Sequence, residues 1–167
     1  MTAATLPTQR VDAMRLALAA AGPIAIGGVL ALRAGDPAPI AATPAIVFGI
    51  AAATCPALYI SIAATKAGPS LAQVARALAA SFGAFGIALA GLVLPALFLS
   101  LSSTSDLTTV VVCSVVLGGA AMIAMLRLAT ELVPRTFGAG VVCFTWAIAT
   151  LGIAGRLWFE LTSEVLL

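Results

Sequence analysis

Long apolar runs alternate with short polar stretches along the whole chain, and none of the runs contains Asp, Glu, Lys or Arg. Five such runs are present, at residues 16–32, 41–65, 77–101, 107–126 and 136–154. A helix needs about 20 mostly apolar residues to cross the hydrocarbon core of a bilayer, so each run has roughly the length of one crossing. The pattern predicts an all-α fold, a polytopic membrane helical bundle with about five transmembrane helices.

Turn and capping residues occupy the stretches between the runs. Gly35 precedes Pro37 and Pro39, which predicts a turn between the first two helices, because proline lacks an amide donor and glycine tolerates unusual φ angles. Ser70 and Gln73 have the spacing of a capping box, which predicts that the third helix begins directly after Ser70. No stretch is long enough for a soluble domain, so residues 1–167 are expected to form a single transmembrane domain.

The composition agrees with this pattern. Hydrophobic residues make up 62% of the 167 residues and charged residues 8%, with a mean hydropathy of +1.19. A soluble domain carries about 25% charged residues, so the lipid bilayer is the expected partner of this chain. The alanine-rich, lysine-poor composition favours a bacterial inner (cytoplasmic) membrane.

Basic residues are distributed unevenly between the two ends of the predicted spans. The side that holds the N-terminus carries Arg10, Arg15, Lys66, Arg76, Arg127 and Arg135, and the opposite side carries Arg33 and Arg156. Short cytoplasmic loops carry an excess of Lys and Arg in membrane proteins. We therefore expect the N-terminus in the cytoplasm and, after five spans, the C-terminus outside.

Several kinds of chemistry lack the residues they require. The chain has no His and three Cys, at positions 55, 113 and 143, without CxxC spacing. Haem sites with His ligands and His-containing metal centres are therefore excluded, and we expect neither a metal nor a cofactor. The cysteines are interpreted as small buried hydrophobic residues. A net charge of +2 offers no surface for nucleic acid, and spans without ionisable residues predict that the protein is not an enzyme.

Three of the predicted spans contain an internal proline, at Pro23, Pro56 and Pro95. Each proline removes a backbone donor, and the freed carbonyl needs another partner in lipid. The most polar patch inside any span surrounds the second proline and consists of Thr54, Cys55, Pro56, Tyr59 and Ser61. It is interpreted either as a small-ligand or gating site, or as a kink whose freed carbonyl is satisfied by Thr or by a neighbouring helix.

Small residues recur at helical spacing in the last three spans. They are Ala80, Ala84, Ala88 and Gly91 in the third, Ser114, Gly118 and Ala121 in the fourth, and Thr145, Ala149 and Gly152 in the fifth. Small residues allow helix backbones to approach closely in a membrane. We interpret these rows as helix-packing faces.

Arg127, Glu131 and Arg135 follow the fourth span at a spacing of four residues. This spacing permits ion pairs along one helix face, although Pro134 limits how far that helix extends. The three residues are a candidate cytoplasmic contact with anionic lipid or with a partner protein.

The segment from Lys66 to Arg76, followed by a span that contains Pro95, resembles bacterial members of the Yip-like multi-pass membrane family. In those proteins a similar cytoplasmic segment leads into a proline-containing helix. The likeness is confined to this part of the chain, and no function is carried over from it.

Two hypotheses for the function remain. The first is a small integral membrane subunit that packs within or anchors a larger membrane protein complex, with other subunits or with copies of itself, and has no catalytic chemistry of its own. The second is a permease or channel component for a neutral or lipid-like substrate, working as a dimer or with a partner subunit. In the second hypothesis the proline-interrupted helices are the moving parts, because broken helices recur in transporters.

Overall fold

Five α-helices account for most of the chain. The computed structural model describes residues 6–64, 69–132 and 137–166, apart from the side chains of residues 6–16, 18, 137 and 139. The helices are α1 (Leu6–Ala34), α2 (Ala38–Ala63), α3 (Leu71–Ser102), α4 (Asp106–Leu132) and α5 (Phe137–Val165). The described residues form no strand, so the predicted all-α fold is confirmed.

Four of the helices are long and apolar enough to cross a membrane. They are α2, α3, α4 and the part of α5 from Gly140 to Val165. The apolar part of α1 in which the side chains are described, Ala19–Ala34, is shorter than a full crossing. The predicted span at residues 16–32 therefore lies within α1, but its first residues fall where side chains are not described. The chain is a helical membrane bundle, as the apolar runs predicted.

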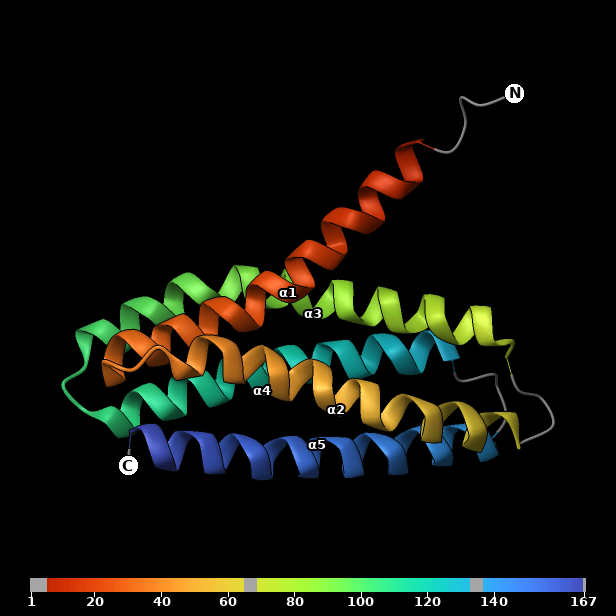
Figure 1. The fold of residues 1–167 in the computed structure, drawn as a ribbon. Coiled ribbons are helices and arrows are strands. Elements are labelled where there is room, and N and C mark those ends of the chain that lie inside the picture. Colours follow the sequence, from red (N-terminus) through yellow and green to blue (C-terminus); the bar gives the residue numbers. More distant parts are fainter. Residues whose placement is uncertain (1–5, 65–68, 133–136, 167) are drawn as a thin grey trace.

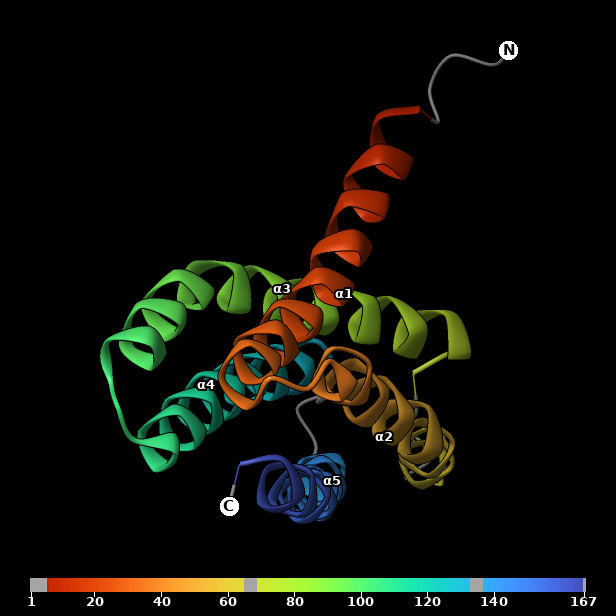
Figure 2. The ribbon, with the colours of Figure 1, turned by 60° about the vertical axis from the view of Figure 1, so that its left-hand side comes forward.

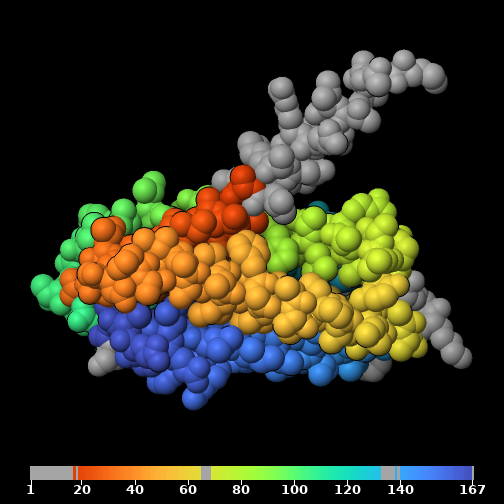
Figure 3. Space-filling view, viewed as in Figure 1, coloured from red at the N-terminus to blue at the C-terminus, as the bar shows by residue number. Residues whose placement is uncertain are grey.

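The helices α2, α3, α4 and α5 run side by side, while α1 joins them only over its C-terminal half (Figure 1). This half of α1 packs on α3 and α2, and the N-terminal part extends away from the bundle (Figure 2). The most extensive contact is between α3 and α4, and α2 and α5 pack along one face of the molecule (Figure 3). In contrast, α4 and α5 contact each other very little.

Two glycines allow α1 to approach its neighbours closely. A Cβ atom on Gly22 would lie 2.8 Å from Cβ and Cδ1 of Leu89 in α3. A Cβ atom on Gly27 would lie 2.3 Å from the backbone oxygen of Pro39 in α2. Neither position can take a side chain unless the helices separate, so these glycines set the spacing of α1 from α2 and α3.

The predicted turn and capping box are both confirmed. Gly35 has a φ of +71°, and its amide donates to the Ala31 oxygen at 2.9 Å, which ends α1 with a left-handed residue. At the start of α3, the Gln73 amide donates to the Ser70 hydroxyl at 3.3 Å and the Ser70 amide donates to the Gln73 side chain at 2.8 Å. These contacts satisfy amides that the first turn of a helix leaves unpaired.

Two helices continue well beyond the predicted spans. The span at 107–126 becomes a helix to Leu132, and the span at 136–154 becomes a helix to Val165. In both extensions an arginine pairs with a glutamate four residues later: Arg127 with Glu131 at 2.7 Å and Arg156 with Glu160 at 2.8 Å. The predicted limits fell at the first charge because charge ends a membrane crossing, whereas the backbone continues as helix into the polar zone.

Arg33 ties the end of α1 to the connection between α3 and α4. Its Nε donates to Asp106 Oδ1 at 2.6 Å, and its two terminal nitrogens donate to the backbone oxygens of Ser103 at 3.2 Å and Thr104 at 2.5 Å. A guanidinium has enough donors to make all three bonds at once. The end of α1 and the connection between α3 and α4, both predicted to lie on the non-cytoplasmic side, are therefore linked through Arg33.

Two groups of buried residues hold the bundle together. The outer cluster lies nearer Arg33 and is formed by Ile26, Val29, Leu30, Phe85, Leu89, Ala96, Cys113, Val116, Ala120 and Trp158. The inner cluster lies toward the opposite end and is formed by Leu58, Ile62, Val74, Ala77, Leu128, Leu132 and Cys143. The described side chains of α1 contribute to the outer cluster and not to the inner one, so the two halves of the bundle are packed differently.

Candidate ligand-binding cavity

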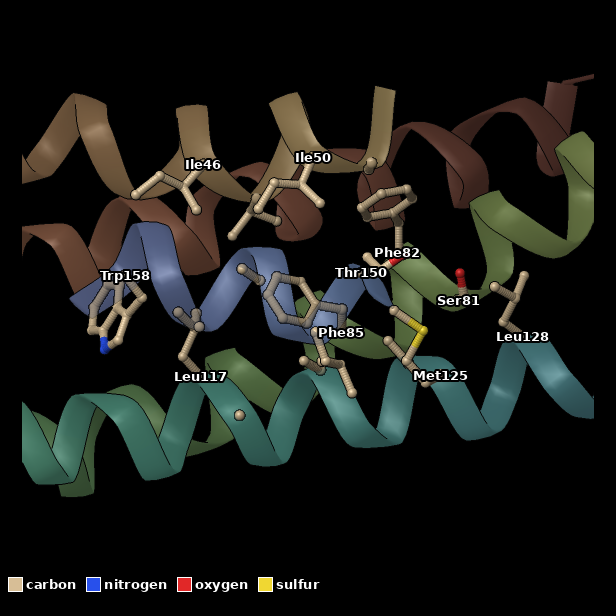
Figure 4. A pocket seen from close by; sticks show the side chains of 18 of the residues that line it. Ile46, Ile50, Ser81, Phe82, Phe85, Leu117, Met125, Leu128, Thr150 and Trp158 are labelled. Carbon is tan, nitrogen blue, oxygen red and sulfur yellow. The ribbon is translucent and has the colours of Figure 1, made fainter. Parts of the chain in front are cut away.

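Four helices line a partly open cavity of about 330 Å³ between the two clusters. Its lining residues come from the middle part of α2, from the first half of α3 and from the middle of α4 and α5, so the cavity lies at the depth of the hydrocarbon core. The side chains labelled in Figure 4 are Ile46, Ile50, Ser81, Phe82, Phe85, Leu117, Met125, Leu128, Thr150 and Trp158. Almost all of the lining is apolar.

Small residues on α4 and α5 create this space. Ser114, Gly118 and Ala121 line the cavity from α4, and Ala154 and Gly155 line it from α5. A Cβ atom on Gly118 or on Gly155 would meet no atom within 4 Å, and both glycines are exposed. The row predicted on the fourth span as a packing face thus forms a wall of the cavity.

Two tryptophans on α5 hydrogen-bond across the cavity walls, and they are the two tryptophans of the chain. The Trp158 indole donates to the Ser114 hydroxyl at 2.7 Å, which links α5 to α4. The Trp146 indole donates to the backbone oxygen of Thr54 at 3.0 Å, which links α5 to α2. Both indoles line the cavity, so α5 is held to its neighbours at two levels with the cavity between them.

The polar groups in the lining differ in how they are satisfied. The Ser81 hydroxyl donates to the Leu78 oxygen at 2.8 Å, and the Ser114 hydroxyl donates to the Val110 oxygen at 2.7 Å. Thr150 is 7% exposed, and its hydroxyl has no hydrogen-bond partner among the residues that the structure describes. None of the described lining residues is charged.

The patch predicted around Pro56 is divided between different surroundings. Cys55 lines the cavity, Thr54 lies in a shallow groove between α2 and α5, and Tyr59 packs against the inner cluster. Pro56 and Ser61 are exposed. The Thr54 hydroxyl donates to the Ile50 oxygen at 2.8 Å, and the Trp146 indole donates to the Thr54 oxygen. Two helix carbonyls near the proline therefore have side-chain donors. The five residues do not converge on one point.

The other predicted prolines also lie in different surroundings. Pro23 is buried within α1, whereas Pro95 is exposed within α3. A further proline inside a helix, Pro44 of α2, was not among the predicted sites. A role of these prolines as hinges stays a prediction.

The row predicted on α3 lies beside the core without forming a close seam inside this chain. Ala80, Ala84 and Ala88 are half-buried, whereas Gly91 is exposed, and a Cβ atom on it would meet no atom within 4 Å. On α5, Thr145, Ala149 and Gly152 are all exposed. The interpretation of these rows as helix-packing faces stays a prediction.

The predicted cytoplasmic contact is described only in part. Arg127 and Glu131 form the ion pair expected from their spacing, and the two side chains are 54% and 39% exposed. Arg135 lies outside the described residues, so the third member of this group stays a prediction.

The cysteines are separate from one another. Cys113 and Cys143 are buried, which confirms their interpretation as small buried residues, and Cys55 is half-buried against the cavity. In the described part of the chain, no three His, Cys, Asp or Glu side chains come together as potential metal ligands.

Sequence reasoning missed the face of α5 that lines the cavity. Trp146, Thr150, Ala154 and Trp158 follow one another at every fourth residue, and all four line the cavity. This spacing places residues on one side of a helix, so the signal was present in the sequence. Two large indoles with small residues between them indicate a recess on that side of α5.

Neither a protein-family model, nor a curated protein, nor a solved structure matches this chain.

Proposed function

We propose that the protein is a component of a permease for a neutral, lipid-like molecule, which enters the cavity from the bilayer. The observation that carries this proposal is an apolar cavity of about 330 Å³ at mid-depth among four helices. A charged ligand would lose its hydration there without gaining a partner of opposite charge. An apolar cavity of about 150 Å³ binds benzene, so the volume suits a larger apolar molecule or one chain of a lipid.

The gap between α4 and α5 supports uptake sideways from the membrane. These helices contact each other little, and the glycines that line the cavity from each of them are exposed. A lipid-like molecule already dissolved in the bilayer then reaches the cavity without crossing water. This route differs from that of a channel for ions, which needs polar groups along its path.

Binding is tested with a probe that quenches tryptophan fluorescence, because both tryptophans line the cavity. Protein in lipid nanodiscs is titrated with 1-bromodecane as wild type, as Gly118→Leu and as Gly119→Leu. Gly118 lines the cavity, whereas Gly119, the next residue on α4, is exposed and has open space beside it. We expect saturable quenching in the wild type and in Gly119→Leu, and its loss in Gly118→Leu. Quenching that rises linearly and equally in all three proteins contradicts the proposal.

Transport is tested separately in proteoliposomes. The probe is a lipid with a fluorescent acyl chain, whose emission is destroyed by dithionite added outside the vesicles. We expect the wild type and Gly119→Leu to accelerate its movement between leaflets, and Gly118→Leu to lose that acceleration. Saturable binding without faster movement of the fluorescent lipid between leaflets would mean that the protein binds lipid but does not transport it. That result contradicts the permease proposal.

A small bundle of this kind is proposed to work as a dimer or with a partner subunit, in a bacterial inner membrane with its N-terminus in the cytoplasm. The excess of Arg on the N-terminal side and the lysine-poor composition support this placement. Fusions of a reporter active only in the cytoplasm test it. Activity at the N-terminus and not at the C-terminus is expected, and the reverse pattern overturns the orientation.

The second candidate function is an integral subunit of a larger membrane complex, without catalytic chemistry of its own. It is favoured by a shallow groove between α2 and α5, lined by Ala42, Ala45, Ile46, Gly49, Ile50, Ala53, Thr54, Ile153 and Leu157. Small residues at this spacing allow another helix to approach. The mass of the intact particle after mild-detergent purification, with its co-purifying chains, tests this candidate. A stoichiometric partner supports it, and a lone monomer without an enriched partner contradicts it.

A further inference from the structure

The Thr150 hydroxyl lacks the hydrogen bond to a helix carbonyl that several other hydroxyl groups in these helices make. Such groups usually donate to the carbonyl three or four residues earlier. Thr54, Ser81, Ser114 and Thr162 all do so, at 2.7 to 2.9 Å. The Thr150 hydroxyl makes no such bond among the described residues, although its side chain is 93% buried (7% exposed).

An unsatisfied buried hydroxyl costs free energy, which a ligand with a matching group recovers. Two other buried hydroxyls, those of Thr43 and Thr109, also lack a partner in the described part of the chain. Neither of them lines the cavity, and Thr150 does. The Thr150 hydroxyl therefore combines an unpaired donor and acceptor with adjacent space for a ligand.

The surroundings of Thr150 restrict the ligand further. Phe82 and Phe85 from α3 and Ile50 from α2 form apolar walls of the same cavity (Figure 4). The hydroxyls of Ser81 and Ser114 already donate to helix carbonyls, and the Ser114 oxygen also accepts from the Trp158 indole. Among the described lining residues, Thr150 thus carries the hydroxyl without a partner, in a space that is otherwise largely apolar and uncharged.

We infer that the ligand is an uncharged amphiphile with one hydroxyl or carbonyl group, which hydrogen-bonds to the Thr150 hydroxyl inside the cavity. This inference rests on the proposed function, and it adds the polar group that the ligand carries and the residue that meets it. The remainder of the ligand is apolar and packs against the aromatic and aliphatic walls.

The test compares two probes that differ by one hydroxyl group, 10-bromodecan-1-ol and 1-bromodecane. Quenching of tryptophan fluorescence is measured in nanodiscs, and each probe is expressed as a mole fraction of the lipid, which removes the difference in partitioning. We expect the alcohol to bind the wild type about 3- to 10-fold tighter than the bromoalkane, the factor that one net hydrogen bond contributes.

Three variants assign this preference to the Thr150 hydroxyl. Thr150→Val keeps the shape and removes the hydroxyl, so the affinity for the alcohol should fall to that for the bromoalkane, which stays unchanged. Thr150→Ser keeps the hydroxyl and should keep the preference. Thr109→Val removes another buried, unpartnered hydroxyl that does not line the cavity, and it should leave both affinities unchanged.

The outcomes separate this inference from the proposed function. Equal affinities of the wild type for the two probes, or a preference that survives in Thr150→Val, overturn the inference and leave the apolar cavity as a binding site. Loss of the preference in Thr150→Ser or in Thr109→Val also overturns it. If neither probe saturates in the wild type, the proposed function itself is wrong.

Discussion

The two long sides of this bundle use glycine in opposite ways. Where α1 meets α2 and α3, a methyl group on Gly27 or Gly22 would overlap Pro39 or Leu89. Between α4 and α5, a methyl group on Gly118 or Gly155 would meet no atom within 4 Å. The same residue type therefore permits close packing on one side and leaves a cavity on the other.

The difference follows from what lies opposite each glycine. Helix α1 presses its glycines against backbone and side-chain atoms of its neighbours, and the outer cluster forms around that contact. The backbones of α4 and α5 do not pack closely against each other. The large Trp158 side chain spans the distance between them and hydrogen-bonds to Ser114. A glycine therefore marks a close contact between helices only where a neighbouring helix packs directly against it.

The largest effect is expected for Gly27→Ala, which breaks the tight side of the comparison. The new methyl group would lie 2.3 Å from the Pro39 oxygen, and a backbone atom cannot rotate away. We expect the free energy of unfolding to fall by about 3 kcal/mol or more, at the upper end of overpacking effects. Thermal unfolding in detergent, followed by circular dichroism, measures the change. Gly28→Ala, one residue further and with open space beside it, is the control and should stay near the wild type.

Gly22→Ala tests the second contact of α1 and should have a smaller effect. The added methyl group would lie 2.8 Å from Leu89 Cβ and Cδ1, a longer distance than the 2.3 Å from Gly27 to the Pro39 oxygen, so a smaller separation of the helices relieves it. We expect a loss of about 1–3 kcal/mol in the free energy of unfolding, measured in the same way. A loss greater than that of Gly27→Ala would show that the α1–α3 seam, and not the α1–α2 seam, limits stability.

Trp158→Phe tests the bond that joins α4 to α5 across the cavity. The substitution keeps an aromatic ring and removes the indole donor to Ser114. Hydrogen bonds between membrane helices contribute about 0.6 kcal/mol on average, so a loss of about 1 kcal/mol in unfolding free energy is expected. Trp146→Phe removes the bond to the Thr54 oxygen and is the matched comparison. If both variants are as stable as the wild type, these bonds do not hold α5 in place.

The smallest effect is expected for Gly118→Ala, on the open side. A methyl group there enters free space, so the unfolding free energy should change by less than about 0.5 kcal/mol. Because Gly118 lines the cavity, the volume available to a ligand decreases at the same time. A strongly destabilised Gly118→Ala variant would mean that α4 packs against another chain at this point.

The sequence predicted the fold class and the helix boundaries near polar residues well. Charge-free runs indicated membrane helices, Gly35 indicated the turn after α1, and Ser70 with Gln73 indicated the start of α3. These signals are local, since each depends on residues within a few positions of one another. Helices α4 and α5 continue past the predicted spans, because charges mark the membrane boundary and helices extend past it.

The candidate site was much harder to predict. The most polar patch, around Pro56, divides among the cavity, the inner cluster and the exposed surface. The row at Ser114, Gly118 and Ala121 was predicted as a packing face of α4, and it borders the cavity. On α5 the exposed row at Thr145 was selected, while the row from Trp146 to Trp158 faces inward. Small residues alone do not distinguish these cases, because alanine and glycine are frequent on every face.

The sequence by itself determined that this chain forms membrane helices, because a run of apolar residues of sufficient length is favourable in lipid regardless of its neighbours. Only the tertiary structure decided which small residues touch another helix and which border open space. That choice depends on how five helices fit together at once, through contacts between residues far apart in the chain, such as Gly27 with Pro39 and Trp158 with Ser114. The position of the cavity, and the unpartnered Thr150 hydroxyl inside it, result from that fit.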